Sequence, residues 1–120
     1  MAPVADQVNA ATVSANLARR GNDGIAFTDF KILPGSPILV RFKWSYHRRS
    51  PDDFSVWLRN VKTRVDYLAL GDVGTRNNGG QLTIGVGVVG TDTGKFQILL
   101  TKLFSTKEKD IYARSGTFDI

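Results

Sequence analysis

Two hydrophobic periods divide the chain. Between residues 4 and 18, apolar side chains recur at spacings of three and four, which is the period of one helix face. The residues on that face are Val4, Val8, Ala11, Ala15 and Ala18. From Ile25 onward the period changes to two, which is typical of half-buried strands. The pattern therefore predicts an N-terminal helix and linker over residues 1–24 and a β-domain over residues 25–120.

The β-domain divides into seven alternating segments separated by turn-forming residues. The clearest is the run that begins at Ile38, in which every second residue is apolar up to Tyr46. The expected strands cover residues 25–33, 38–47, 54–59, 65–73, 82–89, 96–103 and 111–120, the last with a bulge at Gly116. Seven short strands in one domain predict an all-β fold, a seven-stranded antiparallel sandwich of the immunoglobulin or fibronectin-III type with an added N-terminal helix.

The inward positions of these strands define the expected core. The predicted core residues are Val40, Phe42, Trp44, Phe54, Val56, Leu58, Ile84, Val86, Phe96, Ile98, Leu100 and Phe118. By the same alternation Tyr46 is expected to face inward with Trp44.

Composition narrows the possible chemistry. The 120 residues include no cysteine and one histidine, which excludes a disulfide scaffold, a thiolate zinc site, a cysteine nucleophile and a two-histidine metal site. No apolar run approaches the ~20 residues of a membrane helix. We therefore expect no metal, no cofactor and no membrane span.

Catalytic residues are not expected either. Asp52 and Asp53 form the one adjacent acidic pair, but they lie in a turn beside Pro51, where aspartate commonly caps the chain. The single histidine, His47, precedes two arginines and is interpreted as a surface loop residue. The sequence therefore predicts a non-catalytic binding protein.

One candidate interface lies on the outward side of the third and sixth expected strands. Trp57 alternates with core positions and should face solvent beside Arg59, and an exposed tryptophan can stack on a sugar or anchor a protein interface. In an immunoglobulin-like order the third strand neighbours the sixth, whose outward residues are Leu99, Thr101 and Leu103. We expect these five residues to form a partly apolar outer patch, which is typical of an interface.

A second candidate is a basic patch. Arg41 and Lys43 alternate outward on the second strand, and Arg48 and Arg49 follow in the next turn. With a net charge of +5, this patch would attract anions in a salt-sensitive manner. Because the aromatic residues of this strand are expected to point inward, the pattern of a single-strand nucleic-acid binder is absent, and nucleic acid is not the expected partner.

Three segments give the domain a resemblance to a known family. They are Phe42-Lys43-Trp44 with residues 50–58 (SPDDFSVWL), residues 94–100 (GKFQILL), and residues 111–120 (IYARSGTFDI). In order and spacing they resemble the Ig-like domain of the fungal killer-toxin-resistance (KRE/KNH-like) family of Ser/Thr-rich cell-wall proteins. The resemblance implies a secreted fungal protein of the cell wall, associated with β-1,6-glucan assembly and without catalytic residues.

Two features depart from that family. The chain has no Ser/Thr-rich stalk and has an extra N-terminal helix, so we expect a free domain. We expect a non-catalytic secreted β-sandwich that binds or organises β-glucan. The alternative is a protein–protein interaction module, an immunomodulatory or effector-like secreted factor. No signal peptide is present in this chain, and a cytosolic location stays open.

The N-terminal helix bears on the oligomeric state. Its stripe is small and alanine-rich, and a lone helix of this length is marginal in water. It would be stabilised by lying on the outer patch around Trp57, either in its own chain or exchanged with a second copy. The second arrangement would give a homodimer, and both arrangements stay open.

Overall fold

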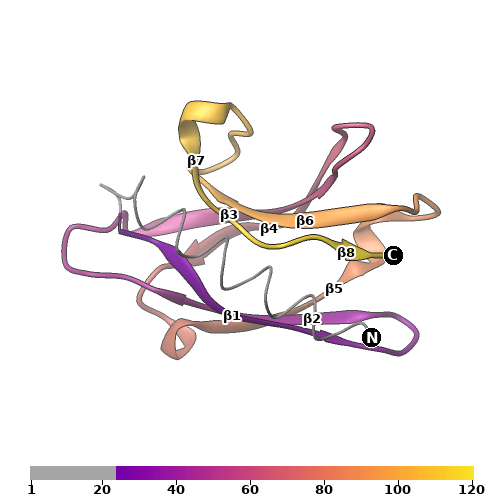
Figure 1. The fold of residues 1–120 in the computed structure, drawn as a ribbon. Coiled ribbons are helices and arrows are strands. Elements are labelled where there is room, and N and C mark those ends of the chain that lie inside the picture. The colour runs from indigo at the N-terminus through magenta and orange to yellow at the C-terminus, as the bar shows by residue number, and fades with distance from the viewer. Residues whose placement is uncertain (1–23) are drawn as a thin grey trace.

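The computed structural model describes residues 24–120 and shows two antiparallel sheets packed face to face (Figure 1). Its strands are β1 (Ala26–Leu33), β2 (Leu39–Ser45), β3 (Asp53–Asn60), β4 (Asp66–Gly74), β5 (Gln81–Gly85), β6 (Lys95–Thr101), β7 (Ile111–Arg114) and β8 (Phe118–Asp119). Three 3-10 turns complete the elements: η1 (Asn78–Gly80), η2 (Val86–Val89) and η3 (Glu108–Asp110). The helix expected over residues 4–18 lies outside the described residues. No helix among residues 24–120 has the length and hydropathy needed to span a membrane.

The sheets have the orders β1-β2-β5 and β4-β3-β6-β7, and β8 pairs with β6 on the same side as β7. Every pairing is antiparallel. The predicted all-β, two-sheet architecture is therefore confirmed for the described residues. The expected neighbourhood of the third and sixth strands is confirmed too, because residues 55–60 of β3 pair with residues 96–101 of β6.

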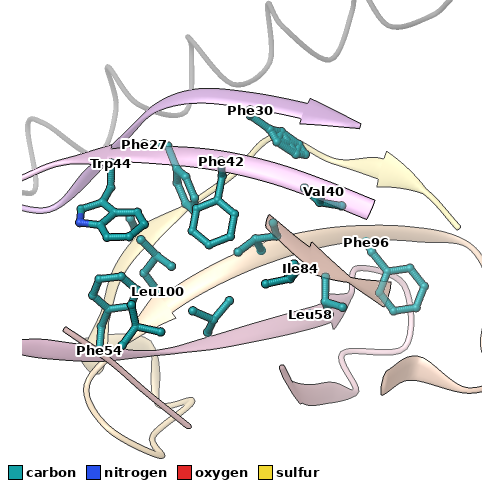
Figure 2. Close-up of a cluster of buried hydrophobic side chains, with 14 of the residues drawn as sticks. Phe27, Phe30, Val40, Phe42, Trp44, Phe54, Leu58, Ile84, Phe96 and Leu100 are labelled. Carbon is teal, nitrogen blue, oxygen red and sulfur yellow. The ribbon is translucent and has the colours of Figure 1, made fainter. Parts of the chain in front are cut away.

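The predicted core is confirmed at all twelve positions (Figure 2). Apolar side chains from both sheets meet there, and the cluster also includes Ile25, Phe27, Phe30, Val73, Val89 and Ala113. Trp44 of one sheet lies edge-on to Phe54 of the other, with ring centroids 5.1 Å apart. Its indole Nε1 donates to the carbonyl oxygen of Thr75 at 2.8 Å, which satisfies the polar atom of the buried ring.

The alternation fails at Tyr46. The prediction that Tyr46 faces inward is wrong, because β2 ends at Ser45 and the tyrosine side chain is 41% exposed. The chain enters a turn there: the amide of His47 donates to Ser50 Oγ, and the amide of Ser50 donates to the His47 carbonyl. Strand periodicity has no meaning beyond the last paired residue.

The fifth expected strand is shorter than residues 82–89. β5 ends at Gly85, and the chain continues as η2, with Gly90 in the left-handed region at φ 62°. Val86 and Val89 are both buried, whereas Val88 is 43% exposed. In a 3-10 turn the side chains at i and i+3 lie on one side, so this spacing replaces the period of two.

The last expected strand is divided over residues 115–117 instead of carrying a bulge at Gly116, which gives eight strands instead of seven. Ser115, the first residue between β7 and β8, is fully buried. The amide of Ile98 donates to Ser115 Oγ at 2.8 Å, and the hydroxyl donates to the carbonyl of Gly116 at 2.7 Å. A side chain thus takes the place of one backbone partner in the ladder, which interrupts the strand.

Asp53, the first residue of β3, should make the free energy of unfolding depend on pH. Partial burial raises the pKa of the Asp53 carboxyl above its usual 3.8, and the neighbouring carboxylates of Asp72 and Asp52 raise it further. Because the folded-state pKa is raised, the folded chain binds this proton more tightly than the unfolded chain does. The resulting stabilisation is complete below about pH 3.8 and is lost as the pH rises through the folded-state value.

We therefore expect Asp53→Asn to increase the free energy of unfolding at pH 7 and to leave it nearly unchanged at pH 3. Urea denaturation at the two pH values measures this difference. Asp119→Asn serves as the control, because its carboxylate pairs with Lys95 at 3.2 Å and its removal should give no gain at pH 7. A pH-independent effect of Asp53→Asn would contradict the electrostatic interpretation.

Candidate functional site

Trp57 lies on the outer face of the five-stranded sheet. It pairs with Leu68 of β4 and with Leu99 of β6, and its chain neighbours Val56 and Leu58 point into the core. The side chain is half-buried. Its indole Nε1 donates to Thr101 Oγ1 at 2.9 Å, which fixes the ring and satisfies its polar edge. The part of Trp57 left to an external ligand is therefore apolar.

Two residues expected to be exposed beside Trp57 instead form a buried floor. Leu99 and Thr101 are 0% exposed, and Leu99 lies between Trp57 and Arg114 in the register of the outer face. Ser55, the partner of Thr101 across β3 and β6, is also 0% exposed. Alternation assigned these residues to the correct face, but side chains on that face cover one another.

Arg59 is not the free cation that the sequence suggests. It is 5% exposed, and its Nε and Nη2 donate to the two carboxylate oxygens of Asp66 at 2.7 and 3.0 Å. Its Nη1 is buried without a hydrogen-bond partner among the described residues. Arg59 therefore forms a bidentate ion pair on the sheet, and its guanidinium group is not available to an external ligand.

Leu103 is half-buried and lies outside the strand in which it was expected. β6 ends at Thr101, and a turn follows in which the amide of Ser105 donates to the carbonyl of Lys102 at 3.0 Å. The amide of Lys102 donates to the carbonyl of Asp110, the residue before β7. This turn carries the next residue, Phe104, onto the outer face.

Phe104 is the most exposed of the large apolar residues that the structure describes, at 63%. Its amide donates to Ser55 Oγ at 2.8 Å, and that hydroxyl donates to the carbonyl of Gly71 at 2.6 Å. The ring lies against β4, since a Cβ added at Gly71 would be 3.0 Å from two ring carbons. Phe104 is therefore held at the same outer face as Trp57, one cross-strand pair away from it.

Charged groups lie at the border of this surface. Arg114 of β7 pairs with Glu108 of η3, and Lys102 is exposed at the end of β6. We use the name aromatic platform for Trp57 and Phe104 above the floor of Ser55, Leu99 and Thr101. It offers two apolar rings with polar groups beside them, which suits a ligand that has both an apolar face and hydroxyl groups.

The basic patch does not join the aromatic platform. Arg41 and Lys43 lie on the outer face of the three-stranded sheet, where Arg41 pairs with Lys31 and Lys43 pairs with Asp29. Arg48 and Arg49 lie in the loop between β2 and β3 and are exposed. The structure thus separates the four predicted residues into two pairs, one on a sheet face and one in a loop.

A surface cavity of about 290 Å³ lies at the far end of β3, lined by residues 60–63 and 92–95. Asn60, which is 2% exposed, joins the two loops around it. Its Oδ1 accepts from the amides of Lys62 and Thr63, and its Nδ2 donates to Asp92 and to the carbonyl of Thr93. Hydrogen bonds from Tyr67, Asn60 and the Thr93 amide lower the pKa of the Asp92 carboxyl against the opposing effect of desolvation. Because these polar groups are hydrogen-bonded to one another, we interpret them as a structural link between the two loops.

Within residues 24–120, no group of three or more histidine, aspartate or glutamate side chains is arranged to hold a metal ion. No protein-family model, no curated protein and no solved structure matches the chain. The interpretation of the site therefore depends on its geometry and on the resemblance of its segments.

The sequence analysis did not identify three residues that contribute to the surface of the protein: Phe104 of the aromatic platform, and Tyr46 and Arg76 at the loop between β2 and β3. Phe104 did have a signal, because it is an aromatic residue between two expected strands, beside residues 105–110, a run of Ser, Thr, Lys, Glu and Asp. Arg76 had none, since its partners are at least 24 residues away in the chain.

Proposed function

We propose that the protein is a non-catalytic, immunoglobulin-like β-sandwich of the fungal cell wall that binds β-glucan through the aromatic platform. The observation that carries the proposal is that Phe104, 63% exposed, is bonded to Ser55, whose cross-strand partner Thr101 accepts the indole N–H of Trp57. The axial C–H groups of a glucose ring form an apolar face that packs on the negative face of an aromatic ring.

The strand order supports the immunoglobulin-like assignment. β1, β2 and β5 take the positions of strands A, B and E, and β3, β6 and β7 take those of C, F and G. β4 pairs with β3 and thus takes the position of strand C′, as in variable-type domains, rather than that of strand D in the opposite sheet.

The positions of the segments that resemble the killer-toxin-resistance family also support the proposal. Residues 50–58 lie largely in β3, residues 94–100 in β6, and residues 111–120 in β7 and β8. These strands are hydrogen-bonded neighbours in one sheet. Except for Phe42-Lys43-Trp44, which lie in β2 of the other sheet, the resembling segments are therefore in the sheet that bears the aromatic platform.

Retention on insoluble β-glucan tests the proposal. We expect the protein to be retained equally at 0.15 and 1 M NaCl, because stacking on neutral sugar is insensitive to salt. Phe104→Ala should lower the affinity about tenfold, which corresponds to about 1.4 kcal/mol of lost contact. Trp57→Phe should lower it as well, since it removes the larger ring and the bond to Thr101.

Tyr46→Ala is the matched control, because Tyr46 is an exposed aromatic residue outside the platform. It should leave retention unchanged. Retention that disappears at 1 M NaCl would mean that the net charge of +5 causes it. Equal losses in Phe104→Ala and Tyr46→Ala would also contradict a site at the platform.

A protein partner is the second candidate function. The isolated exposure of Phe104 favours it, because a single large apolar side chain beside a fixed tryptophan is typical of an interface anchor. A competition experiment distinguishes the two functions. If the platform binds sugar, soluble β-glucan oligosaccharides should displace the protein from insoluble glucan. If they do not, the platform is a protein interface.

A further inference from the structure

Arg76 organises the loop of residues 46–52, which joins β2 to β3. Its Nη2 lies 3.1–3.2 Å from the carbonyl oxygens of His47, Arg48 and Ser50 and donates to them. Its Nη1 donates to the carboxylate of Asp52 at 3.3 Å. The guanidinium carbon also lies 5.8 Å from the centroid of the Tyr46 ring. One side chain from the loop after β4 thus contacts most of this loop.

The loop is held from within as well. The amide of His47 donates to Ser50 Oγ, the amide of Ser50 donates to the carbonyl of His47, and the amide of Arg49 donates to His47 Nδ1. Surface loops usually lose such bonds to water and remain mobile. Here the amide of Arg49 and the carbonyl of Arg48 are both hydrogen-bonded, to His47 and to Arg76.

This fixed loop presents unpaired cations. Arg48 and Arg49 are exposed, and neither pairs with a carboxylate in the part of the chain that the structure describes. Tyr46 lies beside them, 41% exposed. The one carboxylate in the contacts of this loop is that of Asp52, which pairs with Arg76 and whose side chain is fully exposed.

We propose that this loop is a binding site for an acidic polysaccharide, a chain that carries carboxylate or sulfate groups. Planar guanidinium groups bind such anions through two parallel hydrogen bonds. Holding Arg48 and Arg49 in place before binding reduces the entropy lost on association. Arg76 is a positioning residue, which bonds to the loop backbone and lies over the Tyr46 ring.

The geometry favours an acidic polysaccharide over a nucleic acid. Single-stranded nucleic acids are bound by stacking successive bases on several aromatic side chains. The loop has one exposed aromatic ring, and Arg76 lies over it. The site is also distinct from the aromatic platform, because none of its residues belongs to that surface.

Titration calorimetry with dextran sulfate and polygalacturonate, with neutral dextran as the blank, tests the inference. We expect binding of both acidic chains, with an affinity that falls with NaCl at a logarithmic slope of about −1.5 for two cation contacts. Arg48→Gln/Arg49→Gln should weaken binding at least tenfold and bring the slope close to zero. Asp52→Asn should strengthen binding, because it removes the one carboxylate bound to Arg76.

The charge-matched control is Lys62→Gln/Arg64→Gln, which removes two exposed cations from the turn at the opposite end of β3. It should change the affinity less than twofold. Arg76→Lys retains the charge but cannot bond several carbonyls from one planar group. It should weaken binding severalfold with an unchanged salt slope, because Arg48 and Arg49 still contact the ligand.

Equal losses in the two double variants would overturn the proposal, since net charge alone would then explain binding. Absence of binding to both acidic chains would overturn it too. Tighter binding of single-stranded oligothymidylate at the same salt concentration would assign the loop to nucleic acid instead. Retention on neutral β-glucan should be unaffected in all these variants, so failure here leaves the aromatic platform independently testable.

Discussion

Phe42→Ala should destabilise the protein by about 3–5 kcal/mol, a large share of the ~5–15 kcal/mol of a typical domain. Phe42 is 0% exposed and contacts aromatic rings on both sides, with centroid distances of 5.6 Å to Phe27 and 5.8 Å to Trp44. The truncation leaves a cavity that rigid neighbouring rings cannot fill. Denaturant unfolding measures the loss.

Leu39→Ala is the control on the same strand, because Leu39 is 37% exposed and points away from the core. It should cost less than about 1 kcal/mol, since little buried area is removed. Similar losses in the two variants would mean that the faces of β2 are not distinguished by burial.

Asp66→Ala should destabilise the fold by about 3–5 kcal/mol, because it leaves the buried guanidinium of Arg59 without its counter-ion. The side chains of Arg59 and Asp66 are 6% and 14% exposed, and Arg59 Nη1 already lacks a partner among the described residues. The loss should be much greater than that of Asp119→Ala, which breaks the exposed pair with Lys95 and should cost about 0–1 kcal/mol.

The double variant Arg59→Met/Asp66→Leu separates the cost of an unpaired charge from the value of the pair. Replacing a buried ion pair by apolar residues is often neutral or stabilising. We expect the double variant to be more stable than Asp66→Ala. If it is equally unstable or worse, Arg59 and Asp66 contribute through packing rather than through charge.

Alternation identified the core because the side chains that enter it follow the period of two along the paired strands. In β2, β3 and β6 the side chains at every second position enter the same core, so a period of two is enough to find them. The break at Ser115 and the turn after Gly85 could not be found in this way. Both depend on hydrogen bonds to residues distant in the chain, such as Ile98 and Ile38.

The candidate site was predictable in its position but not in its exposure. The outward direction of Trp57 follows from its neighbours Val56 and Leu58. The burial of Leu99 and Arg59 does not, because it depends on what else lies on the same face of the sheet. The position of Phe104 depends on the bond of its amide to Ser55, and that of Arg76 on its bonds to the loop after β2. No local sequence pattern predicts these contacts.

The most direct test of the central claim is a nuclear magnetic resonance titration of the full chain with soluble β-glucan oligosaccharides. We expect resonance shifts, with one saturating affinity, at the indole N–H of Trp57 and at the amides of Ser55, Thr101 and Phe104. The indole N–H of Trp44, bonded to Thr75 within the core, should stay unchanged. Absence of shifts at Trp57 and Phe104, or saturating shifts confined to other surfaces, would contradict glucan binding at the aromatic platform.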